Sequence, residues 1–179
     1  MAITAPQLVE IYDCTFERAN RFCQFLNEAM GRFDINSPER QAAFLAQVGH
    51  ESGRLRYVEE LASGRAYEGR ADLGNSEPGD GVRYKGRGLI QITGRGNYAK
   101  ASEALDVDFI GEPELLERPG YACLSAAWFW ATHGLNELAD TGDFRKITRR
   151  INGGFNGLAD RLALWDDAKR VLNASYAGG

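Results

Sequence analysis

Residues 37–53 read SPERQAAFLAQVGHESG, a stretch that combines a clear helix signal with an acidic residue where the helical pattern stops. Ser37 followed by Pro38 is a typical helix start, with the serine as cap and the proline as the first helical residue. Apolar residues then recur at the spacing of one helix face: Phe44, Leu45 and Val48. We therefore expect a helix with one buried face that ends near His50 and Glu51.

The helical spacing of apolar residues continues on both sides of this stretch. It predicts further helices over residues 5–11, 15–32, 98–105, 122–132, 143–151 and 159–172. The segment 122–132 contains Trp128, Phe129 and Trp130 and is so apolar that we expect it to form the core. Residues 89–92 are a short apolar run that predicts a small strand or a turn.

Seven glycines occur from Ser63 to Gly88, and apolar residues do not recur there at helical spacing. This pattern predicts a long ordered loop region, which in a domain of this size is commonly functional. The glycine content also predicts mobility in this region. The chain as a whole is expected to be mainly α, with long loops.

The composition limits the classes of protein to which the chain can belong. A chain of 179 residues, 44% of them hydrophobic, is long enough for one core and too short for two ordinary domains, so residues 1–179 are expected to form a single domain. Lys and Arg number 21 and Asp and Glu 25, a net charge of −4, and no segment gathers the basic residues into a stripe. Nucleic acid is therefore not an expected partner.

The cysteines and the N-terminus point to a reducing compartment. The three cysteines, Cys14, Cys23 and Cys123, form an odd set without the spacing of a zinc site, which predicts free thiols and no metal. The N-terminal residues do not resemble a signal peptide, and no apolar run is long enough to cross a membrane. We expect a monomer that is made in the cytoplasm and does not insert into a membrane.

Glu51 is the first candidate for chemistry, because its carboxyl should emerge where the apolar helix meets solvent. Partial burial disfavours the charged form of a carboxyl, so the pKa of Glu51 would be raised and the group could deliver a proton at neutral pH. Position alone favours the alternative, a helix-end glutamate in a solvated ion pair.

A second carboxylate is available eight and nine residues downstream, at Glu59 and Glu60. On one unbroken helix, an offset of nine residues turns by about 180°, so Glu51 and Glu60 would face opposite ways. The helix must therefore break between them, and Gly53 makes a break plausible. A returning loop would bring the carboxyls to the ~6.5–9.5 Å that leaves room for a water, and this separation implies inversion at the sugar carbon.

Residues 84–98, YKGRGLIQITGRGNY, combine four glycines with uncharged side chains that donate and accept hydrogen bonds: Gln91, Thr93 and Asn97. Such groups suit a sugar, on which Tyr84 and Tyr98 could stack. A polar surface turn remains the alternative. His50 has no partners for a catalytic triad, and we expect it to make a structural or orienting hydrogen bond.

The strings FLAQVGHESG, EL, YEGRADLGNSEPGDGVRYKGRGLIQITGRGNY and INGG, followed by an arginine at 161, resemble glycoside hydrolase family 19, in its bacteriophage endolysin and chitinase-like branch. The similarity runs from about residue 27 to residue 172. The resemblance implies a lysozyme-like, mainly helical domain split by a central substrate cleft, an inverting mechanism, and neither metal nor cofactor.

The resemblance also implies roles for individual residues. Glu51 would be the general acid, and Glu60, whose EL context matches better than that of Glu59, the general base. Thr93 would help to hold the attacking water. The implied substrate-binding residues are Tyr84, Gln91, Asn97, Asn152 and Arg161, the last two as a network that supports the base. Plant relatives carry a further glutamate where this chain has Asn156, which puts that part of the network in doubt.

The leading hypothesis is a single-domain endolysin, without a separate cell-wall-binding domain, that cleaves the β-1,4 bonds of peptidoglycan glycan strands. It would be made in the host bacterial cytoplasm and act on the cell wall after another factor permeabilises the membrane. An endochitinase of the same fold is the second hypothesis. A catalytically silent glycan-binding module and a secreted toxin with the same chemistry are further alternatives.

Overall fold

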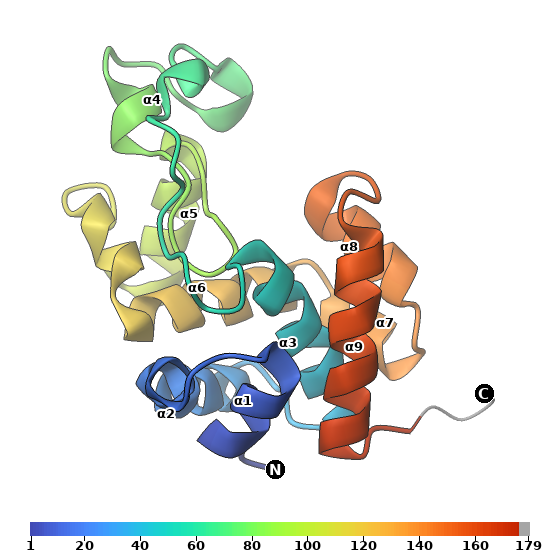
Figure 1. Cartoon of the computed structure of the whole chain (residues 1–179). Helices are drawn as coiled ribbons and strands as arrows, with labels where there is room; N and C mark the ends of the chain where they lie inside the picture. Colours follow the sequence, from blue (N-terminus) through green and yellow to red (C-terminus); the bar gives the residue numbers. More distant parts are fainter. Residues whose placement is uncertain (176–179) are drawn as a thin grey trace.

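The helix that ends at Glu51 lies at the centre of the computed structural model, which describes residues 1–175. This helix, α3 (Pro38–Glu51), is buried over nine consecutive residues, 41–49, so neighbours cover it on all sides rather than on the one face expected. It packs most extensively against α9 (Leu158–Leu172), as Figure 1 shows. The Ser37 hydroxyl caps α3 by accepting a hydrogen bond from the Arg40 amide at 3.2 Å, as the helix-start signal predicts.

The other predicted helices are confirmed, with their ends displaced by a few residues. Besides α9, they are α1 (Ala5–Tyr12), α2 (Phe16–Arg32), α5 (Arg95–Leu105), α6 (Pro119–Thr132) and α8 (Phe144–Asn152). Several short elements were not predicted: η1 (Arg65–Tyr67), η2 (Ala71–Leu73), α4 (Asp80–Arg83), η3 (Pro113–Glu117) and α7 (Leu135–Asp140). These elements are too short to show a repeated apolar spacing.

Helix α6 packs against α2 and carries the largest buried side chain of the core, Trp130. Its ring meets Phe44 of α3 edge-on, with centroids 5.4 Å apart, and its indole N–H donates to Asn136 at 2.8 Å. Trp128 and Phe129 are only half-buried. The prediction that this segment belongs to the core is therefore confirmed, with Trp128 and Phe129 packed at the edge of the core.

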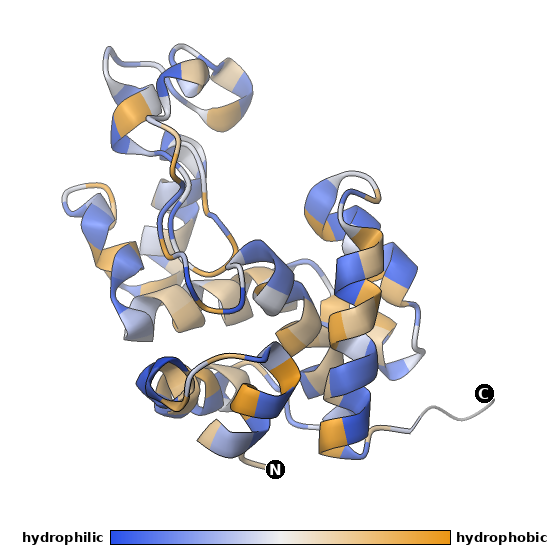
Figure 2. Cartoon of the chain, in the orientation of Figure 1, coloured by the Kyte–Doolittle hydropathy of each residue, from blue (hydrophilic) through white to orange (hydrophobic). Residues whose placement is uncertain are grey.

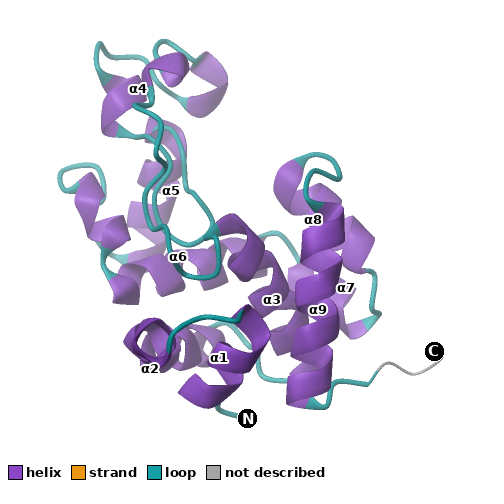
Figure 3. Ribbon diagram, viewed as in Figure 1, coloured by secondary structure: helices purple, strands orange, loops and turns teal. Residues whose placement is uncertain are grey.

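A second lobe lies between α3 and α6 in the chain and projects away from the helical body (Figure 1). Three extended stretches, around Glu59, Arg87 and Ile92 in chain order, connect it to the body. Figure 3 draws them as loops. They are joined by isolated antiparallel bridges, Glu59 to Arg87 and Arg87 to Ile92. Residues 89–92 therefore form a turn, in which the Ile92 amide donates to the Arg87 carbonyl at 2.8 Å.

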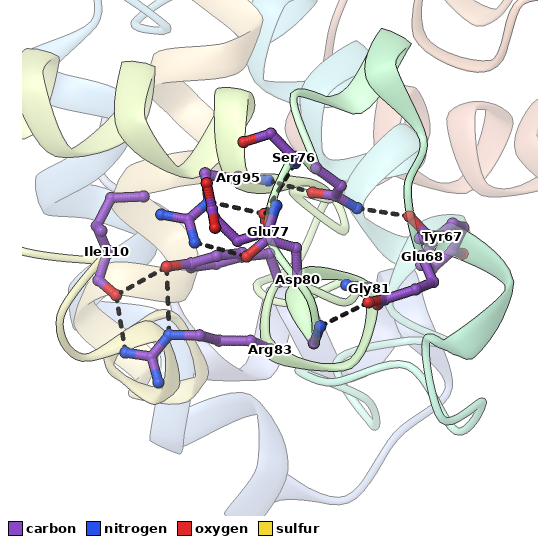
Figure 4. A network of polar contacts seen from close by, with 12 residues as sticks. Tyr67, Glu68, Ser76, Glu77, Asp80, Gly81, Arg83, Arg95 and Ile110 are labelled. Carbon is purple, nitrogen blue, oxygen red and sulfur yellow. Dashed lines mark hydrogen bonds and ion pairs between the residues drawn. The ribbon is translucent and has the colours of Figure 1, made fainter.

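Polar contacts hold the tip of this lobe together (Figure 4). The Asp80 carboxylate accepts two bonds from the Arg95 guanidinium, at 2.6 and 2.8 Å, and two from the Ser76 and Glu77 amides, both at 3.0 Å. Asn75 links the Tyr67 carbonyl to the Arg95 amide, at 2.8 Å each. The glycine-rich segment 63–88 is thus ordered by hydrogen bonds to backbone groups, because it has few apolar residues to bury.

The helical body, unlike the lobe, is stabilised by the burial of apolar side chains. Figure 2 shows hydrophobic and hydrophilic residues alternating along α9, the pattern of a helix with one face on the core.

Within residues 1–175 no helix is both long and apolar enough to cross a membrane. The three cysteines are free, with Cys123 buried and the other two half-buried.

Candidate active site

Glu51 is the last residue of α3, and its carboxylate is held from behind by a buried arginine. Arg161, 1% exposed, donates from Nη2 to Glu51 Oε1 at 2.5 Å. Its Nη1 donates to Gln47 Oε1 at 2.5 Å, and Gln47 in turn donates to the Thr148 hydroxyl at 2.8 Å. This chain of contacts fixes the orientation of the Glu51 carboxyl, whose side chain is 20% exposed.

The helix breaks directly after Glu51, as the separation of the two candidate glutamates requires. Gly53, Arg54 and Leu55 all have left-handed backbone conformations, with φ of 56°, 60° and 61°. The Arg54 amide closes the turn by donating to the Gly49 carbonyl at 2.7 Å. Left-handed conformations cost non-glycine residues about 1–2 kcal/mol each, so contacts elsewhere must hold this turn in place.

Asp160 of α9 supplies such contacts. Its carboxylate pairs with His50 Nδ1 at 2.7 Å and with the Arg54 guanidinium at 2.6 Å, one on each side of Glu51 in the chain. Burial raises the pKa of Asp160, but the hydrogen bonds from His50 and Arg54 outweigh it and keep the pKa below its ordinary value. The predicted structural hydrogen bond of His50 is thus confirmed.

Glu60 lies on the first extended stretch and turns its side chain toward Gly86 on the second. Its Oε2 accepts from the Gly86 amide at 2.8 Å and from the Tyr67 hydroxyl at 3.2 Å. Its Oε1 is buried and accepts no hydrogen bond from the described residues. A buried carboxylate oxygen without a donor is uncommon and calls for a functional explanation.

Gly86 shows that Glu60 lies close to two of the predicted site residues. A Cβ atom at this glycine would lie 2.7 Å from both Glu60 Oε2 and Gln91 Oε1, and 3.3 Å from Thr93 Oγ1. The three oxygen atoms therefore surround one point on the backbone. Glu60, Gln91 and Thr93, each predicted from the sequence as a site residue, form one cluster.

Glu59 does not belong to this cluster. Its carboxylate pairs with Lys85 at 2.6 Å, and its side chain is 41% exposed. Adjacent residues of an extended chain point to opposite sides, so Glu59 and Glu60 cannot both face Thr93. The geometry favours Glu60 as the second carboxylate.

A groove of about 610 Å³ runs beside this cluster, between the second lobe and helices α6 and α8. Gln91, Thr93 and Asn97 line one wall, and Asn97 is fixed by donating to the Thr93 carbonyl at 2.8 Å. Their contact with sugars stays a prediction. The opposite wall is formed by Trp128, Phe129, His133, Arg150 and Ile151.

Sequence reasoning missed the two aromatic residues of this wall. Trp128, Phe129 and Trp130 are consecutive, and helix positions turn by about 100° each, so the three cannot all face one core. This angular spacing predicts that at least one of the three side chains faces away from the core.

The structure corrects the expectation for Tyr84 and Tyr98. Both rings are buried, 1% and 0% exposed, and pack against each other edge-on at 5.1 Å. Their hydroxyls donate to the carbonyls of Ile110, at 3.2 Å, and Lys85, at 2.6 Å. Neither ring can stack on a sugar, because both are enclosed by protein.

The positions and contacts of Arg161 and Asn152 also differ from those expected. Arg161 is too buried to bind substrate, and it supports Glu51, the proposed acid, rather than the base. Asn152 ends α8, next to the groove residue Ile151, and its Nδ2 is buried without a partner among residues 1–175. At the position of the missing glutamate, the Asn156 carbonyl accepts from Arg161 Nε at 3.2 Å.

Comparison with known proteins identifies the family of the chain. The family model for class I chitinases, of glycoside hydrolase family 19, matches residues 5–141. A family 19 domain-containing protein of Haemophilus influenzae is 37% identical over 158 residues, which cover 70% of this chain and 76% of that protein. An endochitinase of Arabidopsis thaliana is 41% identical over 114 residues, 63% of this chain but only 39% of its own length.

Solved structures show the same fold. A bacterial family 19 chitinase superposes with a TM-score of 0.83 over 100% of this chain and 98% of its own, at 22% identity. Chitinase C from Streptomyces griseus gives a TM-score of 0.81 over 99% of this chain and 79% of its own, also at 22% identity. The predicted mainly helical, lysozyme-like fold is confirmed.

Proposed function

The chain belongs to glycoside hydrolase family 19, and on this premise we propose that it hydrolyses the β-1,4 bonds between amino sugars of bacterial peptidoglycan by an inverting mechanism. The observation that carries the proposal is the Glu60 carboxylate. One of its oxygens is fixed by Gly86 and Tyr67, and the other is buried and free of donors within the described chain. Such an oxygen is suited to accept a proton from an attacking water.

The two glutamates take different roles because their surroundings differ. Glu51, oriented by Arg161, donates a proton to the oxygen of the leaving sugar. Glu60 removes a proton from the water, and the Thr93 hydroxyl beside it helps to orient that water. In this scheme the bond from the sugar carbon to the leaving oxygen breaks as the bond to the water oxygen forms on the opposite face.

Replacement of each glutamate by glutamine tests these roles. Removing a general acid or base typically lowers the rate by ~10²–10⁴, so Glu51→Gln and Glu60→Gln should leave little clearing in a zymogram of purified peptidoglycan. Glu59→Gln is the matched control, since its neighbour is Lys85 rather than the cluster, and it should clear like wild type. Full clearing by either of the first two variants would refute the mechanism.

Hydrolysis of chitin is the second candidate, and the names of the plant relatives favour it. Chitin and peptidoglycan share N-acetylglucosamine and differ by the lactyl-peptide arm. Release of reducing ends from chitin oligomers and from peptidoglycan, measured side by side, separates the two candidates. Mass spectrometry of the products then identifies which sugar carries the new reducing end.

The biological role that we propose is lysis of a bacterial host, with the enzyme made in the cytoplasm and reaching the wall after another factor opens the membrane. Bacteria that produce the enzyme should remain intact until their membrane is permeabilised, and then lose turbidity rapidly. Lysis without permeabilisation would contradict this role. Gene neighbourhood distinguishes it from that of a secreted toxin.

A further inference from the structure

Helix α8 presents a cationic face at the edge of the groove, although no basic stripe was expected from the sequence. All four cationic side chains of this helix are exposed: Arg145, Lys146, Arg149 and Arg150. At about 100° per residue they cover an arc of roughly 140°, opposite the buried side chains of Phe144 and Ile147. None of the four lies within 4.0 Å of a carboxylate of the described chain. We call this surface the α8 cationic face.

Helix stability does not account for this arrangement. Arg149 and Arg150 lie in the last turn of α8, where positive charge is favourable to the helix dipole. Arg145 and Lys146 lie in the first turn, where positive charge is unfavourable. In a chain with a net charge of −4, two unpaired cations at the unfavourable end point to a ligand outside the chain.

The face is continuous with the groove. Arg150 and Ile151 line the groove directly, and Lys100 lines it from the opposite wall. The Arg150 guanidinium is fixed by donating to the His133 carbonyl at 2.8 Å, and it flanks Gly134 together with Glu137 without forming an ion pair. Arg145 lies over the ring of Phe155, which is 45% exposed, at 5.2 Å. These contacts hold Arg150 at the groove and Arg145 beside Phe155.

We propose that the α8 cationic face binds the carboxylates of the peptide stems of a peptidoglycan strand whose sugars lie in the groove. This inference rests on the proposed function and names what selects peptidoglycan over chitin. The stems branch from alternate sugars and carry free carboxylates, whereas chitin is uncharged. A strand that lies in the groove with its stems turned toward α8 presents these anions to the α8 cationic face.

The test compares intact peptidoglycan with the same strands after an amidase has removed their stems. Arg145→Glu/Lys146→Glu is the variant of choice, because acidic residues in the first turn favour the helix and folding should be preserved. On intact peptidoglycan we expect KM to rise about threefold to tenfold, with kcat little changed. This rise is the combined effect expected from the loss of a few exposed ion pairs. On stripped strands the variant and wild type should have equal kinetics.

Arg21→Glu/Arg32→Glu on α2 is the matched control, with the same change in charge at exposed arginines outside the groove. It should behave like wild type on both substrates. Equal KM values for the α8 variant and wild type on intact peptidoglycan would overturn the inference. An equal rise on stripped strands would also overturn it, because the face would then bind something other than the stems.

Failure of the proposed function would look different. If wild type cleaved chitin oligomers and not peptidoglycan, the substrate assignment would fail, whatever the α8 face does. Co-sedimentation of the Glu60→Gln protein with intact and stripped sacculi measures binding without turnover in that case. Binding that depends on stems and is lost when Arg145→Glu/Lys146→Glu is added would still support the inference, and binding independent of stems would reject it.

Discussion

At the scale of single residues, the account depends on how the side chain of Glu60 is held. Its position relative to Gln91 and Thr93 is set by the absence of a side chain at Gly86. The crowded atoms are the ends of flexible side chains, which can shift without disturbing the backbone. A methyl group at residue 86 should therefore move the carboxylate more than it harms the fold.

Gly86→Ala should lower kcat by about 10- to 100-fold, since a misplacement near 1 Å at the reacting groups has such effects. The melting temperature should change little. Gly31→Ala is the control, because nothing lies within 4 Å of a Cβ atom there. A Gly86→Ala enzyme with wild-type kcat would show that the position of Glu60 is not critical.

Arg161 is the residue through which α9 orients Glu51. Removing one partner of a buried ion pair leaves the other charge and Gln47 without a donor, so Arg161→Ala should lower the free energy of unfolding by about 3 kcal/mol. Denaturant unfolding measures this loss. Arg32→Ala, at an exposed site, should stay within about 0.5 kcal/mol of wild type. A loss below 1 kcal/mol for Arg161→Ala would contradict the structural role.

At the scale of elements, the tip of the second lobe depends on one ion pair rather than on apolar packing. The hydrogen bonds from Arg95 hold the pKa of the Asp80 carboxyl below its ordinary value of 3.8. A carboxyl whose pKa is lower in the folded state stabilises that state above its ordinary pKa, and the contribution is lost as pH falls through the folded value.

The lobe should therefore open in acid before the body does. Hydrogen exchange of residues 67–98, corrected for the intrinsic rate, should show less protection at about pH 3 than at about pH 6, while α3 stays protected. In Asp80→Asn, protection of the lobe should be low at both pH values. A lobe equally protected at both pH values in the wild-type protein would exclude this role for the ion pair.

The helices also show which features of the fold can be predicted from the sequence. The long helices were predictable, because apolar spacing and capping side chains such as Ser37 act locally along the chain. The Asp143 side chain accepts from the Lys146 amide at 3.1 Å, as a helix cap does. The break after Glu51 was predictable from the separation of the two glutamates, but its left-handed form was not.

Contacts between distant segments could not be predicted in this way. Arg161 meets Glu51 across 110 residues of chain, and no local pattern specifies which of two glutamates it supports. Tyr84 was expected to stack on a sugar because it flanks the glycine-rich stretch 84–98. The fold buries it, since Arg83 and Arg95 cover its ring at 5.6 and 5.0 Å.

At the scale of the whole molecule, the proposed mechanism combines one carboxylate from the helical body with one from the stretches that lead to the polar lobe. Glu51 belongs to the body and is oriented by α9, whereas Glu60 belongs to the stretches that lead to the lobe. The central claim is that a water molecule attacks the sugar from the side of Glu60 while Glu51 protonates the leaving group.

The anomeric form of the first product tests this claim most directly. Proton NMR, recorded within minutes of adding enzyme to a β-1,4-linked amino-sugar oligomer, distinguishes the α and β forms before they equilibrate. Attack by water from the face opposite the leaving group gives the α anomer first, with the β form rising slowly afterwards. Initial release of the β anomer would mean that one glutamate acts as a nucleophile, and would contradict the mechanism.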